Sequence, residues 1–155
     1  MQIYAGRMID APHPISAISP CTCLLLRKAA RRVSQIYDHH LAPYGLTITQ
    51  FALLSHIRTY DGIGIGGLAG KLVMDPTTLT RNLRPLERER LIIQVPDRND
   101  KRNRNLHLTQ VGRDALKTAR PGWQAAQKEV DAALGQDDGP AMAGAIDRML
   151  QRLAE

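Results

Sequence analysis

Helical periodicity runs through most of this 155-residue chain and is interrupted once, by two short runs that flank a charged loop. Residues 91–95 are mostly apolar and β-branched, and residues 105–108 alternate between polar and apolar. Between them lies the polar segment 96–104, PDRNDKRNR. Two short strands around such a loop predict a β-hairpin. The chain should therefore be mainly α, with one small β-hairpin.

Apolar residues at three- and four-residue spacing predict helices on both sides of this hairpin. We expect a first helix over about 19–42, which begins at Ser19 and Pro20, and a second helix that is capped by Thr47 or Thr49. A short helix over 66–72 should follow, and then a helix that begins at Asp75 and Pro76. After the hairpin we expect a long helix from Thr109 and a last helix before the C-terminus. Pro85 and Pro121 fall inside two of these helices. We expect a kink or a tightened end at Pro85 and a bend at Pro121.

The formal net charge is +6 and the pI is near 9.7, which favours a polyanionic partner, either nucleic acid or an acidic membrane surface. No stretch approaches the roughly 20 apolar residues that span a bilayer. Residues 1–18 show no helical period and no secretory signal, and we expect an irregular arm there. Two cysteines give no disulfide framework. These features predict a cytoplasmic protein without a membrane partner.

A short helix, a tight turn, a second helix and a basic hairpin together predict a winged helix-turn-helix. The second helix of such a motif enters the major groove of DNA. Its exposed positions here would be Thr77, Thr78, Thr80, Arg81 and Arg84. Hydroxyls can reach phosphates or base edges, and arginine can bind guanine through two hydrogen bonds. The alternative for this face is the ordinary solvated side of an amphipathic helix.

The hairpin loop adds four cations that could contact DNA, namely Arg98, Lys101, Arg102 and Arg104. Residues 75–104 hold eight basic and five acidic residues, a net charge of +3. An arginine at a hairpin tip can enter the minor groove, where the negative potential is strongest. Asp97 and Asp100 could fix the loop by pairing with neighbouring arginines. Helix and hairpin together favour double-stranded DNA as the partner.

Four segments resemble the MarR family of bacterial regulators. They are GLTITQFALL (45–54), LAGKLVMDPTTLTRNLRPLERERLI (68–92), DRNDKRNRNLHLTQVGR (97–113) and the helical ends. The resemblance covers roughly residues 20–155. It implies an obligate homodimer, a near-palindromic operator, repression as the commoner habit, and effector control through the spacing of the two wings.

This resemblance implies one domain over 19–155, with a winged core at about 47–108 and dimerisation helices at about 19–42 and 109–154. Apolar stripes on the helices at both chain ends also favour a two-fold dimer, since the small core cannot cover them. One position departs from the family pattern D-x-R-D-x-R of the wing. Asn99 stands at its third position, and Arg98 beside it can substitute.

Cys21 and Cys23 are candidates for a thiol sensor. Both fall in the first turn of the expected first helix, whose N-terminus favours a thiolate, and Arg27 is a possible cationic neighbour one turn after Cys23. Cys23 also resembles the reactive cysteine of the organic-hydroperoxide-sensing branch of the family, and Tyr37 resembles one of its two assisting tyrosines, while Arg27 replaces the other. The alternative is a small structural residue. A Cys21–Cys23 disulfide is not expected, because residues two apart on a helix point to different faces.

A second possible control is a small phenolic ligand held between the dimer helices and the winged core. The polar groups that could meet it are those of Tyr37, Tyr44, His39, His40 and His56. Adjacent histidines on a helix diverge and no third ligand is evident, so we expect no metal and no cofactor.

Enzymatic motifs are missing from the sequence. It has no phosphate-binding glycine loop, no H-E-x-x-H, no G-x-S-x-G and no paired zinc cysteines. The prediction is a DNA-binding transcriptional regulator that is not an enzyme. The remaining alternative is a winged-helix module that only binds other proteins.

Overall fold

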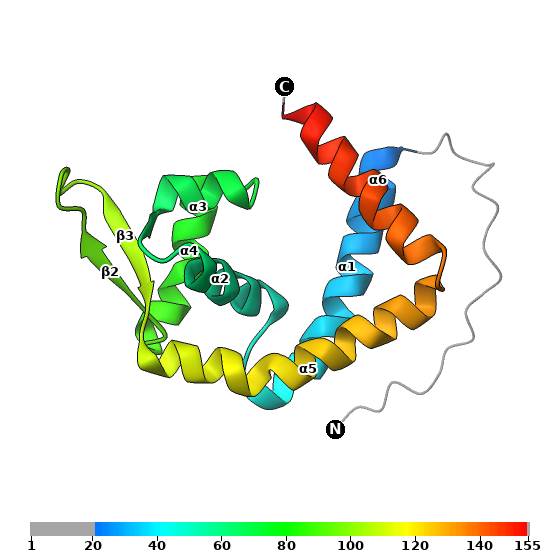
Figure 1. Ribbon diagram of the computed structural model, residues 1–155, viewed down its shortest axis with the longest axis horizontal. Coiled ribbons are helices and arrows are strands. Elements are labelled where there is room, and N and C mark those ends of the chain that lie inside the picture. Colours follow the sequence, from blue (N-terminus) through cyan, green and yellow to red (C-terminus); the bar gives the residue numbers. More distant parts are fainter. Residues whose placement is uncertain (1–20, 155) are drawn as a thin grey trace. The chain divides into compact units, whose positions relative to one another are not determined.

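The computed structural model describes residues 21–154, so the arm expected over residues 1–18 and the helix start expected at Ser19 and Pro20 lie outside the described residues. In chain order the elements are α1 (Thr22–Leu41), the short 3-10 helix η2 (Ala42–Tyr44), α2 (Ile48–Thr59), β1 (Ile63–Gly64), α3 (Ile65–Lys71), α4 (Pro76–Arg88), β2 (Ile92–Pro96), β3 (Arg104–Leu108), α5 (Gln110–Leu134) and α6 (Asp138–Leu153) (Figure 1). The expectation of a mainly α chain with a small β-hairpin is confirmed.

The chain divides into two units at Val33. Of the first unit, the described part is Cys21 and the beginning of α1, up to Val33. The second unit starts at Ser34 and contains the end of α1 together with every later element.

The starts of three helices follow from capping side chains. Thr47 and Gln50 form a capping box at α2, in which each side chain bonds the backbone N–H of the other residue. Asp75 accepts a hydrogen bond from the Thr78 N–H at α4, and Thr109 accepts one from the Gly112 N–H at α5. Of the two caps that the sequence offers for α2, the structure uses Thr47.

The core of the second unit is made of aliphatic side chains from the end of α1, from α2, α3, α4 and α5, and from the sheet and the turn before it. The largest fully buried ones are Leu41, Leu53, Leu54, Ile57, Leu68, Leu79, Leu83, Leu86, Ile92 and Leu106. On α4 the three buried leucines share one side of the helix, and the threonines and arginines predicted to meet DNA are on the others. Burial of this leucine face therefore fixes which side of α4 is presented to solvent.

The sheet has three antiparallel strands in the order β1-β3-β2. The hairpin of β2 and β3 is the predicted one, and Ile92 pairs with Leu108 at its base. The two-residue strand β1 is an addition: Ile63 pairs with Leu106 and Gly64 with Asn105. A strand this short has no detectable period in a sequence, which is why the pattern did not indicate it.

Both internal prolines are contained within continuous helices. Pro85 lies inside α4, which runs on to Arg88, and Pro121 lies inside α5, which runs on to Leu134. α4 ends in a Schellman-type cap: Arg90, with a φ of +57°, donates its N–H to the Glu87 carbonyl, and Leu91 donates its N–H to the Leu86 carbonyl. The kink or tightened end expected at Pro85 stays a prediction. The bend expected at Pro121 stays a prediction.

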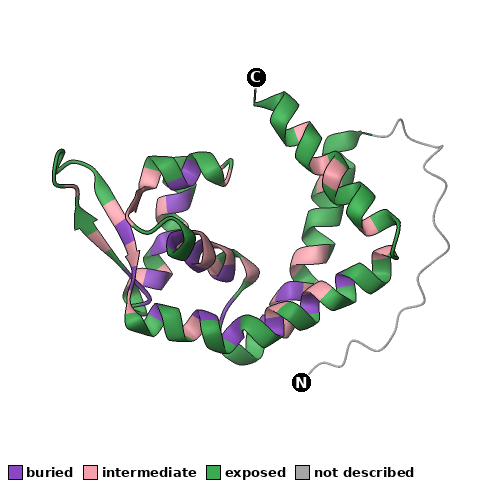
Figure 2. Cartoon of the chain, viewed as in Figure 1, coloured by how far each residue is buried: buried purple, intermediate pink, exposed green. Residues whose placement is uncertain are grey.

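No residue of α6 is buried (Figure 2). Its apolar side chains include Met142, Leu150 and Leu153, of which Leu153 is 77% exposed. In the other unit, Leu24 and Leu25 near the start of α1 are also exposed. The described chain therefore leaves apolar surface uncovered on its first and last helices.

Candidate nucleic-acid interface

The solvent-facing side of α4 gathers the predicted base-reading residues. Thr77, Thr80, Arg81 and Arg84 together line one open hollow of about 300 Å³. The Thr80 hydroxyl donates to the carbonyl of Pro76, at 2.9 Å, and its oxygen can still accept. Within the described residues, neither arginine makes an ion pair with an acidic side chain. Both guanidinium groups are therefore available to an external anion.

Arg88 belongs to the same basic surface, although it is not among the predicted DNA-contacting residues. It lines a second hollow with Arg81 and Arg84, and Glu87 and Pro85 are the other lining residues. Arginines at 81, 84 and 88 are spaced by three and four residues, which places them on one side of a helix. This spacing was the signal that could have identified Arg88.

The wing loop is ordered by its two acidic residues. Asp97 accepts hydrogen bonds from the backbone N–H groups of Asn99, at 2.7 Å, and Asp100, at 3.1 Å, and from the side-chain amide of Asn105, at 2.9 Å. Asp100 accepts from the N–H of Arg102, at 3.0 Å. The bond from the Asn105 amide, followed by those from the two N–H groups, holds the pKa of Asp97 below its usual range.

These bonds correct one expectation. Pairing with neighbouring arginines was one way in which the two acids could fix the loop, but they bind backbone N–H groups and asparagine amides instead. Among residues 21–154, no ion pair involves Arg98, Lys101, Arg102 or Arg104. The four cations of the wing are exposed, and the loop that carries them has its own hydrogen-bonded frame.

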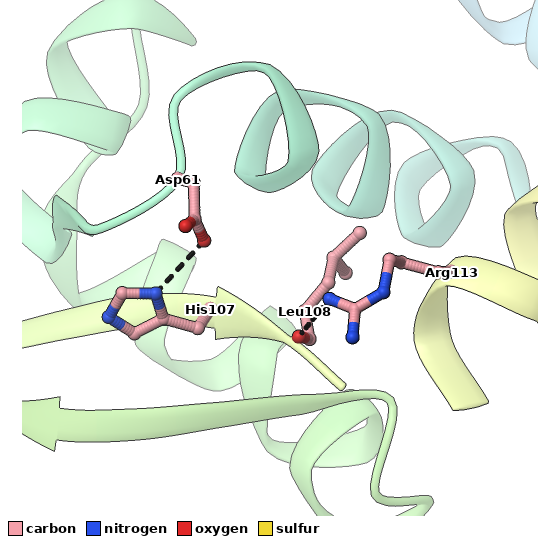
Figure 3. A network of polar contacts seen from close by, with 4 residues as sticks. All are labelled: Asp61, His107, Leu108 and Arg113. Carbon is pink, nitrogen blue, oxygen red and sulfur yellow. Dashed lines mark hydrogen bonds and ion pairs between the residues drawn. The ribbon is translucent and has the colours of Figure 1, made fainter. Parts of the chain in front are cut away.

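The base of the wing is tied to the helices on both sides (Figure 3). His107 of β3 contacts Asp61, in the turn after α2, with 2.9 Å between Nδ1 and Oδ1. Arg113 of α5 donates from its guanidinium to the carbonyl of Leu108, at 2.9 Å. The wing is therefore anchored to α2 and α5 by side chains that sequence reasoning did not select.

A second connection holds the wing to α4. The Thr109 hydroxyl donates to the carbonyls of Arg90, at 2.6 Å, and Leu91, at 3.1 Å, and the Thr109 N–H also bonds the Leu91 carbonyl. Gly112 lies against that same carbonyl, and a Cβ there would be 2.0 Å from its oxygen. The start of α5 thus holds the connection between α4 and β2 in place through these contacts.

The candidate sensing residues fall in both units. Cys21 precedes α1, Cys23 lies in its first turn, and both thiols are exposed, as is Arg27. Tyr37 belongs to the second unit, where its hydroxyl donates to Gln127 of α5. Burial, with a smaller contribution from Asp131, raises the pKa of Tyr37.

The other polar groups that were considered for a phenolic ligand differ in their partners. His40 contacts Glu129, with 2.7 Å between Nε2 and Oε2, and His56 contacts the carbonyl of Ala52 through Nδ1. His39 and Tyr44 are exposed.

No helix within 21–154 is both long and apolar enough for a membrane span, and no three His, Cys, Asp or Glu side chains of this range cluster as metal ligands would.

Comparison with known proteins agrees with this geometry. The model of the MarR family matches residues 46–103, from two residues before α2 to the end of the wing loop. The transcriptional regulator SarZ of Staphylococcus epidermidis is 30% identical over 99 residues, which are 64% of this chain and 67% of SarZ.

Solved structures extend the similarity over most of the chain. The M. tuberculosis transcriptional regulator MosR in complex with DNA has a TM-score of 0.78 and 36% identity, over 87% of this chain and 97% of that one. A mutant of MarR from E. coli complexed with operator DNA has a TM-score of 0.76 over 83% of this chain and 92% of that one, and at 24% identity it supports the fold alone. With a basic α4 face and a basic wing on one frame, this chain belongs to the MarR family of winged-helix, DNA-binding transcriptional regulators.

Proposed function

We propose that this regulator reads double-stranded DNA with α4 in the major groove and with the wing loop against the neighbouring groove. Thr77, Thr78, Thr80, Arg81 and Arg84 would contact bases and nearby phosphates, and Arg98, Lys101, Arg102 and Arg104 would contact the duplex from the wing. The observation that carries this proposal is that the cations of both surfaces have no acidic partner within residues 21–154. Binding then requires no internal ion pair to break.

We propose that the functional species is a homodimer on a near-palindromic operator. The exposed apolar side chains of α6, such as Leu150 and Leu153, support a partner surface there. Two copies related by a two-fold axis would place their recognition helices about one DNA turn apart. The protein would work in the cytoplasm as a repressor, by binding and not by catalysis.

A salt series with duplex DNA tests this proposal. Fluorescence anisotropy should show an affinity that falls steeply as salt rises, because DNA-bound counterions are released on binding. Arg84→Ala and Arg102→Ala should each weaken binding, and the dimer should persist in sedimentation. Lys128→Ala, which removes an exposed cation from α5, is the matched control. Normal binding by both arginine variants would show that the contact assignment is wrong.

A small anionic aromatic ligand is the effector class that a specific hollow supports. This hollow, of about 280 Å³, lies between α2 and α5. Trp123 stacks on Phe51 beside it, with ring planes 10° apart, and Arg58, Lys117 and Arg120 supply positive charge around it. An aromatic floor with a cationic rim fits a ring that carries a carboxylate or phenolate.

Trp123 is the only tryptophan of the chain, so its fluorescence reports on this hollow. Titration with salicylate should change the emission of the wild type with a saturable curve, and Arg120→Ala should weaken that response. Arg148→Ala on α6 lies away from the hollow and should respond like the wild type. An identical titration curve for Arg120→Ala would contradict this site.

Thiol oxidation is the second candidate for control, and the exposure of Cys23 supports it. The Cys23 thiolate would take the outer oxygen of a hydroperoxide, becoming a sulfenic acid while the alcohol leaves. The wild type should then lose DNA affinity under hydroperoxide, and Cys23→Ser should keep it. Equal loss of binding by the two proteins would reject this role, with Cys21→Ser as the control for the neighbouring thiol.

A further inference from the structure

One hollow of the second unit lies between the start of α3 and the wing. It measures about 380 Å³, and its walls are the segment Gly64–Gly67 on one side and the wing loop with the start of β3 on the other. The pairing of Gly64 with Asn105 joins the two walls in one sheet. The hollow therefore lies at the loop end of the hairpin, where the pairing of β1 with β3 holds the start of α3 beside the wing.

One wall of this hollow is bare backbone. Three of its four residues are Gly64, Gly66 and Gly67. A Cβ added at Gly66 would meet no atom within 4 Å, so the space in front of this residue is open. Segments without side chains allow another molecule to approach the backbone closely.

The opposite wall is cationic. Arg102 and Arg104 line it, whereas the two other cations of the wing, Arg98 and Lys101, do not. The single acid of the lining is Asp97, whose carboxylate already accepts three hydrogen bonds from the wing loop. This carboxylate is thus bound within the wing loop, and with two arginines and one aspartate the lining keeps a net charge of +1.

We infer that this hollow seats the sugar-phosphate backbone of one DNA strand, with Arg102 and Arg104 on its phosphates and the glycine wall allowing the close approach. The inference rests on the proposed function, since the wing must lie on a duplex. It divides the wing cations into two groups. Arg102 and Arg104 bind phosphates whatever the base sequence, and Arg98 and Lys101 remain for the groove.

Two glycines of α3 provide a matched test. Gly66 and Gly70 are both exposed, neither has a positive φ, and a Cβ at either one meets nothing within 4 Å. Only Gly66 lines the hollow. Gly66→Glu would place a carboxylate where the phosphate should sit, whereas Gly70→Glu adds the same charge outside the hollow. Melting temperatures of both variants check that they fold.

The probe is a fluorescein-labelled, mixed-sequence duplex of about 30 base pairs, which is adequate because phosphate contacts carry no sequence information. Gly66→Glu should weaken binding about tenfold or more, and Gly70→Glu by less than about threefold. Arg102→Ala and Arg104→Ala should each reduce the slope of log K against log salt by about 0.9, the value for one phosphate contact.

The outcomes separate this inference from the proposed function. If the wild type binds the duplex and the two glutamate variants lose the same affinity, the hollow is not a phosphate seat. If the wild type itself shows no salt-dependent binding, the proposed function fails and the inference with it. A large loss for Gly66→Glu alone, together with the reduced salt slopes, is the result that supports it.

Discussion

Gly112→Ala should destabilise the junction between the DNA-reading helix and the wing. The added Cβ would lie 2.0 Å from the Leu91 oxygen and 2.9 Å from its carbon, although such contacts essentially never fall under 3.0 Å. The backbone must therefore move by about 1 Å, which strains the Thr109 bonds to the carbonyls of Leu91 and Arg90. Overpacking costs about 1–3 kcal/mol and each lost hydrogen bond about 1 kcal/mol, while alanine returns about 1 kcal/mol of helix propensity.

The net loss should be about 2–4 kcal/mol, which for a chain of this length lowers the melting temperature by roughly 5–15 °C. Thermal unfolding by circular dichroism measures it, at one fixed protein concentration because a dimer's transition depends on concentration. Gly70→Ala is the control: its Cβ meets nothing, and its melting temperature should stay equal or rise. If the two variants melt at the same temperature, the steric reasoning at the junction is refuted.

Three further changes test the frame around the interface. Val73 has a φ of +50° and is 80% exposed, so Val73→Asn should stabilise the fold by about 1 kcal/mol in thermal unfolding, whereas Val111→Asn should not. Asp97→Asn should loosen the wing loop and weaken DNA binding at neutral pH. Because the pKa of Asp97 is lowered, its carboxylate stabilises the loop at pH values above the ordinary pKa range of aspartate, and this stabilisation is lost as the pH falls through the lowered pKa. The amide NMR shift of Asn99 in the wild type should therefore titrate at a pH below the ordinary aspartate range. Asn99→Arg should raise DNA affinity and steepen the salt slope by about 0.9, and an unchanged slope would place position 99 away from the duplex.

Much of the fold could be predicted because local signals agreed with one another. Leu79, Leu83 and Leu86 recur at helical spacing, Asp75 and Pro76 mark the start of the same helix, and all three leucines are buried. The hairpin was equally clear from two short runs around a polar loop. The strand β1 could not be found, because two residues are enough to pair with β3 and too few to show a period.

The contacts that fix the site were harder to predict, since they join residues distant in sequence. Asp61 and His107 are 46 positions apart, and Thr109 bonds a carbonyl 19 positions earlier. Neither pair belongs to a recognisable sequence motif. Every residue has a backbone carbonyl, so no residue type indicates which carbonyl will accept a hydrogen bond. The sequence predicts which side chains contact DNA, whereas the contacts that hold their supporting elements together become visible only in the three-dimensional fold.

The acids of the wing show why residue type alone misassigned a contact. A loop with Asp97 and Asp100 among four cations invites pairing by charge, but an exposed ion pair contributes at most about 1 kcal/mol. An aspartate that accepts backbone N–H groups in a turn fixes the chain itself, and it does so locally. Asp97 accepts a hydrogen bond from the backbone N–H of residue 99 and not from its side chain. The geometry of the loop is therefore kept although asparagine replaces the arginine of the family pattern at this position. Because these acids bind backbone N–H groups and amides, they do not pair with the cations of the wing, which remain available to an external polyanion.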